Sequence, residues 1–88
     1  MSNSNIIVHI SIPKAIGDSK TITLEKNSTV FDAINKLNQS KLLEKVMKND
    51  TEFSQFVLIY LNEQRIKDSS LLLVGNSNIE IIIPMAGG

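Results

Sequence analysis

The residues that could take part in chemistry lie at the end of this sequence, where Gly87 and Gly88 follow Pro84, Met85 and Ala86. Glycine has no side chain, so a carboxylate carried by two glycines can enter a channel only as wide as the backbone. Pro84 has no amide hydrogen to donate to a neighbouring strand, and it therefore ends the apolar run before it. We expect the last five residues to form a flexible functional tail, with the carboxylate of Gly88 as the reacting group.

No other cluster of residues predicts a reactive or metal-binding site. His9 is the only histidine, the chain has no cysteine, and strand alternation directs His9 away from the core. Glu44, Asp50 and Glu52 are close in sequence, but they fall on a helix face and in a loop, where acids usually serve solvation. We therefore expect no metal site and no bound cofactor.

The composition restricts the class of protein. A chain of 88 residues forms one small domain, and 42% apolar residues with only 5% aromatic ones predict an aliphatic core. Nine basic and nine acidic residues balance, without a basic run, which argues against nucleic-acid binding. No apolar stretch approaches the roughly 20 residues needed to cross a bilayer, so we expect no membrane association and a cytoplasmic location.

The first third of the chain predicts a β-hairpin. Residues 6–12 alternate, with Ile6, Val8, Ile10 and Ile12 on one face, and Pro13 ends the strand. After a turn, residues 20–24 alternate again with Ile22 and Leu24 facing inward. The two strands pair through the short loop between them.

Two helices are predicted next. Thr29 and Asp32 have the spacing of a capping box, and the apolar stripe Val30, Ala33, Ile34 and Leu37 follows with helical period. Ser40 is a candidate cap for a second, short helix, whose stripe is Leu42, Leu43, Val46 and Met47.

The last third predicts strands. The apolar run 56–61 is expected to be a central strand, followed by a turn at 62–64 and short strand segments at 65–66 and 71–74. The strongest turn signal is 75–78, and the last strand follows it directly.

This order predicts an α+β, two-layer β-grasp fold. Its mixed four- to five-stranded sheet packs on one main helix and a short second helix, and the first and last long strands lie side by side, parallel, at the centre. The expected organisation is a disordered N-terminus at 1–5, the domain at 6–83 and the tail at 84–88.

The same order, with a free Gly87-Gly88 end, resembles the ubiquitin-like sulfur-carrier family, and is most similar to the small subunit of molybdopterin synthase. Residues 29–34, 57–62 and 81–88 carry the resemblance, which spans roughly residues 6–88. Two departures are Gly75-Asn76-Ser77-Asn78, where the family usually has an acidic turn, and Glu63, where a glycine often follows the turn asparagine.

The resemblance implies a carrier rather than an enzyme. An adenylating enzyme similar to ubiquitin-activating enzymes would use ATP to adenylate Gly88, and sulfur from a donor would convert it to a thiocarboxylate. The tail would then dock in the large catalytic subunit of molybdopterin synthase, which supplies the catalytic residues, and give its sulfur to a pterin precursor.

Apolar residues off the core face predict a docking surface beside the tail. The candidates are Ile7, Ile82 and either Ile59 or the pair Leu58 and Tyr60, although such residues are often covered by a loop or simply tolerated. The predicted partner-binding set takes Ile59 of these two choices and consists of Ile7, Ile59, Ile82, Pro84, Met85, Ala86 and Gly87.

Two alternatives remain open. The same activation could serve a ubiquitin-like protein modifier, or a carrier for tRNA thiolation or thiamine synthesis. The chain could also be a β-grasp interaction domain whose closing glycines are incidental, since chain ends are often loose.

Overall fold

The computed structural model describes residues 4–84. The elements in chain order are β1 (Asn5–Ser11), β2 (Lys20–Glu25), β3 (Ser28–Thr29), α1 (Val30–Lys36), α2 (Ser40–Val46), β4 (Leu58–Leu61), β5 (Gln64–Ile66), β6 (Leu72–Leu73) and β7 (Ser77–Ile82). Neither helix of this described part is long and apolar enough to cross a membrane.

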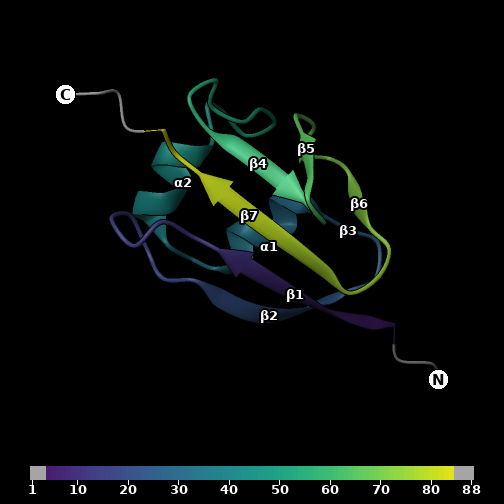
Figure 1. The fold of residues 1–88 in the computed structure, drawn as a ribbon. Coiled ribbons are helices and arrows are strands. Elements are labelled where there is room, and N and C mark those ends of the chain that lie inside the picture. The colour runs from purple at the N-terminus through teal and green to yellow at the C-terminus, as the bar shows by residue number, and fades with distance from the viewer. Residues whose placement is uncertain (1–3, 85–88) are drawn as a thin grey trace.

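Five strands form the main sheet in the order β2-β1-β7-β4-β5, and β3 pairs with β6 in a separate two-stranded ribbon. β1 and β7 are parallel neighbours, whereas β2, β4 and β5 pair antiparallel. The strands lie in front of both helices in Figure 1. The predicted α+β β-grasp arrangement, with β1 and β7 side by side, is confirmed.

The core lies between the sheet and the helices, and its composition follows from the alternation in the strands. β1 has a strictly alternating burial pattern, which buries Ile6, Val8 and Ile10 on the helix side. The same cluster contains Val30, Ala33 and Ile34 of α1 and Leu42 and Val46 of α2. The core is aliphatic throughout, as the composition predicts.

The start of α1 is fixed by the capping box that the sequence predicts. The Asp32 N–H donates to the Thr29 hydroxyl at 3.0 Å, and the Thr29 N–H donates to the Asp32 carboxylate at 2.9 Å. The two bonds satisfy backbone donors that a helix leaves free at its first turn.

The cap predicted for α2 is wrong. Ser40 is the first helical residue, and the N-cap is Gln39, which makes no side-chain cap hydrogen bond. The Gln39 amide instead accepts from the Asp18 N–H and donates to the Asp18 carbonyl, both at 3.3 Å. Gln39 therefore ties the loop after β1 to the start of α2, a long-range role that local spacing does not reveal.

Two predicted boundaries also differ from the structure. The predicted strand 56–61 is shorter in the structure, where β4 begins at Leu58. The Val57 N–H donates to the Ser54 carbonyl at 3.2 Å instead of to a neighbouring strand, and Phe56 is 71% exposed. β4 is paired on both sides and lies next to the middle strand β7, as predicted. At the other end, Asn5 already belongs to β1 and the Ser4 carbonyl accepts from the Lys26 N–H, so the predicted disorder is wrong for both residues. Residues 1–3 lie outside the described residues.

The hairpin between β4 and β5 turns on two residues with positive φ, Asn62 at 50° and Glu63 at 72°. Leu61 pairs with Gln64 across this turn. Turns of this kind match the twist of the strands and favour Asn-Gly. Asn62 suits its position, and its carboxamide oxygen also accepts from the Asn78 N–H at 2.9 Å. Glu63 does not suit its position.

We predict that Glu63→Gly stabilises the domain. A residue with a side chain held at positive φ costs about 1–2 kcal/mol, against about 0.5–1 kcal/mol for the greater chain entropy that glycine loses on folding. The expected net gain in the free energy of unfolding is about 0.5–1 kcal/mol, measured by urea denaturation. Glu63→Ala is the control and should give no such gain; equal stability of the two variants would contradict the prediction.

Candidate functional site

The tail begins at the end of the middle strand of the sheet. Ile82 is the last residue of β7, Ile83 is half-buried against the core, and Pro84 is exposed. Met85, Ala86, Gly87 and Gly88 lie outside the described residues, so their roles stay predictions. The segment that leads to them leaves the sheet at the surface.

β7 is paired on both sides up to Glu80 and on the β4 side up to Ile82. Glu80 pairs with Ser11 of β1, and Ile82 pairs with Leu58 of β4. The alternate residues Ile79 and Ile81 are only 1% and 2% exposed. Two ladders and a buried face give the tail a rigid base, so a partner that binds the tail also finds a fixed surface beside it.

Three half-buried side chains form that surface on the side of the sheet away from the helices. Leu58 and Tyr60 are two residues apart on β4 and therefore share a face, and Leu58 lies directly opposite Ile82. We call Leu58, Tyr60 and Ile82 the tail-side patch. The sequence left open whether Ile59 or the pair Leu58 and Tyr60 faces away from the core, and the structure shows that it is the pair.

Ile59 is a correction to the predicted partner-binding set. It is 1% exposed and belongs to the core, because alternation along β4 turns it to the helix side of the sheet. A side chain in this position cannot contact a partner without unfolding part of the domain.

Ile7 is exposed, at 46%, but it does not join the tail-side patch. Its N–H donates to the Asn76 side chain at 2.8 Å, which places it beside the start of β7. Asn76 precedes Ile82 by six positions in the sequence, or about 20 Å along a strand. Ile7 therefore lies at the opposite end of the face from the tail.

The histidine lies on the exposed face of β1, as strand alternation predicts. His9 is exposed, and its Nδ1 lies 2.6 Å from the Thr21 hydroxyl on the paired strand β2. Within residues 4–84 no group of three or more histidine, cysteine or acidic side chains is arranged to hold a metal ion.

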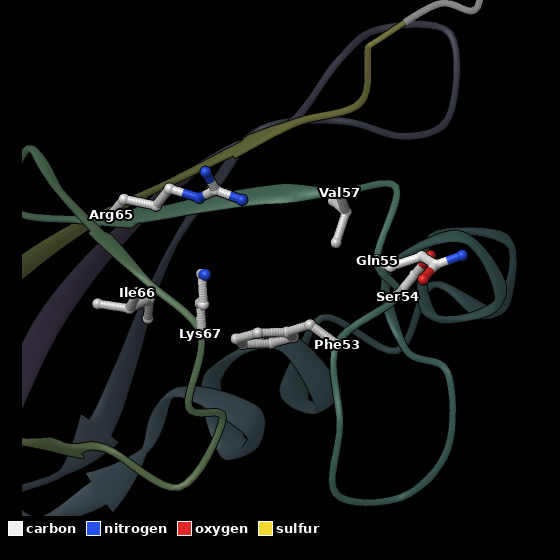
Figure 2. A pocket seen from close by; sticks show the side chains of 7 residues that line it. All are labelled: Phe53, Ser54, Gln55, Val57, Arg65, Ile66 and Lys67. Atoms are coloured by element: carbon white, nitrogen blue, oxygen red, sulfur yellow. The ribbon is translucent and has the colours of Figure 1, made fainter.

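A pocket of about 250 Å³ lies near the end of the sheet where β7 finishes. The sequence did not reveal this pocket. Its apolar lining comes from Phe53, Val57 and Ile66, and its charged lining from Arg65 and Lys67 (Figure 2). The alternation Arg65-Ile66-Lys67 is a visible sequence signal for two cations on one side of a strand. Nothing in the sequence places Phe53 beside them.

Asp68 is the titratable group with a clear shift in its pKa. The Ser70 hydroxyl donates to its carboxylate at 2.6 Å and the Ser70 N–H donates at 2.9 Å, and both bonds lower the pKa of Asp68 below 3.8. Because the pKa of Asp68 is lower in the folded state, its carboxylate stabilises the fold at pH values above the ordinary pKa. This contribution to the free energy of unfolding is lost as the pH falls through the lowered pKa.

We predict that Ser70→Ala moves the pKa of Asp68 upward, toward 3.8, because the hydroxyl bond is the larger cause of the shift. The pKa can be measured by an NMR titration of the carboxyl carbons. Ser77→Ala is the control, since that hydroxyl donates to the Gly75 carbonyl instead. A pKa of Asp68 that does not change in Ser70→Ala would show that the hydroxyl does not cause the shift.

The assignment of Ile82 to the tail-side patch and of Ile59 to the core gives a prediction about these two isoleucines. Ile82→Asp should leave the domain folded, with a loss of about 1 kcal/mol in the free energy of unfolding, because this side chain is already partly in water. Ile59→Asp should cost at least about 4 kcal/mol and unfold much of the protein, because it puts a carboxyl group in the core. Urea denaturation followed by circular dichroism measures both, and similar losses in the two variants would contradict this assignment of faces.

The comparisons with known proteins agree with this architecture. The structure is similar to the solution structure of the HVO 2177 protein from Haloferax volcanii, with a TM-score of 0.77 at 14% identity, covering 100% of this chain and 92% of that one. It is also similar to the crystal structure of SAMP1 from Haloferax volcanii, with a TM-score of 0.73 at 16% identity, covering 96% of this chain and 99% of that one. No curated protein sequence matched the chain.

The decisive match comes from the sequence itself. The profile of the ThiS family matches residues 11–88, which is nearly the whole chain and includes the closing glycines. The fold, the tail that follows the middle strand and this match agree with one another. The chain belongs to the ThiS family of ubiquitin-like sulfur carriers.

Proposed function

We propose that this protein is a sulfur carrier for molybdopterin synthesis, acting as the small, non-catalytic subunit of a molybdopterin synthase. The observation that carries the proposal is the route of the chain at the end of β7. The strand is paired on both sides up to Glu80 and with β4 up to Ile82, and Pro84 is exposed two residues later. Four residues then lead to the Gly88 carboxylate, which is the atom group that the chemistry requires.

The chemistry begins with activation, because a carboxylate is a poor electrophile. In the proposed reaction a carboxylate oxygen of Gly88 attacks the α-phosphorus of ATP, and pyrophosphate leaves. A persulfide on a sulfur donor then attacks the acyl carbon and displaces AMP. A second thiol cleaves the sulfur–sulfur bond, which leaves a thiocarboxylate on Gly88 and a disulfide on the donor side. This chain has no cysteine, so both thiols belong to other molecules.

The proposed partners are an adenylating enzyme, a sulfur donor and the large catalytic subunit of the synthase. Each must hold the tail, and the tail-side patch gives them a common surface at its base. Leu58 and Ile82 are cross-strand partners there, and a partner that covers them buries apolar area next to the segment it must thread. ATP is used by the activating enzyme and is not a resident cofactor of this chain.

Two observations favour alternative products of the same activation. The match to the ThiS family favours a sulfur carrier for thiamine synthesis, and the structural similarity to SAMP1 favours a modifier attached through Gly88 to other proteins. Thiolation of tRNA uses the same carrier chemistry. These alternatives differ in what receives the sulfur or the acyl group, while the activated residue stays the same.

We predict that the chain purified from its native host carries a thiocarboxylate, visible by intact-mass spectrometry as the exchange of one oxygen for sulfur. Removal of Gly87 and Gly88 should abolish the modification without unfolding the domain, because the tail follows the last strand. The control is Lys20→Ala at an exposed position; Gly17→Ala would not serve, because its added Cβ would clash with the Gln39 side-chain oxygen.

The outcomes distinguish the alternatives. Gly88 linked through an isopeptide bond to lysines of other proteins would identify a modifier instead. A thiocarboxylate that a pterin precursor and a molybdopterin synthase large subunit fail to consume would contradict the molybdopterin assignment. An activity that survives removal of both glycines would contradict the whole proposal.

A further inference from the structure

We infer that the pocket near the base of the tail receives an acidic segment of a protein partner. An apolar side chain of that segment enters between Phe53, Val57 and Ile66, and a neighbouring carboxylate lies against Arg65 and Lys67. Only one part of this inference rests on the proposed function, namely that the partner which supplies the acidic segment also binds the tail.

The pocket forms where the segment before β4 and the segment after β5 move apart. The ladder between β4 and β5 ends at Ile59 and Ile66, and beyond it the two chains diverge. The gap is closed farther along by a single bridge between Glu52 and Asp68. Figure 2 shows Phe53 and Val57 reaching into the space between the two segments from the side opposite Lys67.

The apolar part of the pocket is preformed. Val57 is buried, and both Phe53 and Ile66 are half-buried and pack against the core. A volume of about 250 Å³ lies just below the roughly 300–1,000 Å³ typical of small-molecule sites. The pocket is therefore better matched to one large side chain of a protein than to a cofactor, and its floor needs little rearrangement to accept that side chain.

The positive charge at the rim of the pocket favours a negatively charged segment of the partner. Arg65 and Lys67 are exposed and two residues apart, so both lie on one side of the chain, and no acid lines the pocket. The remaining polar lining comes from Ser54 and Gln55, which are neutral. A guanidinium can hold a carboxylate with two parallel hydrogen bonds, and the ammonium adds a second positive charge. Glu52 and Asp68 flank the lining without belonging to it, and their carboxylates accept hydrogen bonds from Asn49 and Ser70, so the two cations are the charged groups of the lining itself.

The position of the pocket connects it with the tail-side patch. Tyr60 pairs with Arg65 across β4 and β5, while Leu58 pairs with Ile82 on the other side of β4. Directly paired residues share a face of the sheet, so Arg65 at the pocket rim lies on the same face as Tyr60 of the patch. One partner surface can therefore cover the patch and reach Arg65, which makes the partner that takes the tail the natural source of the acidic segment.

The test uses the isotope-labelled full chain and synthetic hexapeptides with blocked ends. A peptide that alternates aspartate and leucine should shift the NMR amide signals of residues 53–57 and 65–67. Peptides that alternate lysine and leucine, or aspartate and alanine, should not. The double variant Arg65→Glu/Lys67→Glu should bind the first peptide about tenfold or more weakly, because charge-assisted hydrogen bonds are lost.

A matched control is available on the opposite edge of the sheet. Lys20→Glu/Lys26→Glu makes the same change in net charge at exposed positions in and just after β2, and it should leave peptide affinity unchanged. Equal weakening in both double variants would contradict a specific site. Shifts of the same amides by inorganic phosphate would show a small-anion site instead, and shifts that depend on protein concentration alone would show a second copy of the chain; either result overturns the inference.

The variant without Gly87 and Gly88 separates this inference from the proposed function. It should lose thiocarboxylate formation and keep full affinity for the aspartate-leucine peptide. If the carrier chemistry fails while the peptide still binds in the pocket, only the proposed function is contradicted. If the thiocarboxylate forms and the peptide does not bind, only the pocket assignment is contradicted.

Discussion

The parallel pairing of β1 with β7 is the constraint on which the rest of the structure depends. Parallel neighbours cannot be joined by a tight turn, so the chain between them must cross over one face of the sheet. Here the crossover contains α1 and α2, whose buried side chains share one aliphatic cluster with both central strands. Because β7 lies in the middle of the sheet, β1 holds it up to Glu80 and β4 holds it up to Ile82, close to the point at which the tail begins.

This arrangement survives very different sequences. The two similar structures share only 14% and 16% identity with this chain, yet their TM-scores are 0.77 and 0.73. What the fold requires is a pattern: alternating β-branched residues in β1 and β7, an apolar stripe on α1 and a cap before it. Many side chains satisfy such a pattern, since cores tolerate substitutions that preserve volume and polarity.

The sequence predicted the features that depend on local physics. The alternation of Ile6, Val8 and Ile10 and the capping box of Thr29 and Asp32 act over a few residues, and the structure has both. What the sequence did not reveal depends on contacts between distant segments. Gln39 was not recognised because its partner is Asp18, and the pocket was missed because Phe53 meets Lys67 only after folding.

The assignment of faces shows the same limit within one strand. The run from Phe56 to Leu61 is apolar at every position, so it has no alternation from which to choose the inward face. The choice is made by pairing: the Asn62 N–H donates to Asn78 of β7 at 2.8 Å, and Ile59 lies opposite Ile81. These long-range bonds turn Ile59 inward and leave Leu58 and Tyr60 on the other side.

The first and last described residues lie at opposite ends of the sheet, which has a practical consequence. β1 and β7 run parallel from the same end of the sheet, so the first described residues lie at the end opposite the one where β7 finishes (Figure 1). A fluorophore, affinity handle or fused reporter attached ahead of β1 is thereby kept clear of anything that grips the far end. The molecule can be immobilised or labelled at one end of the sheet while the end of β7 stays clear of the label.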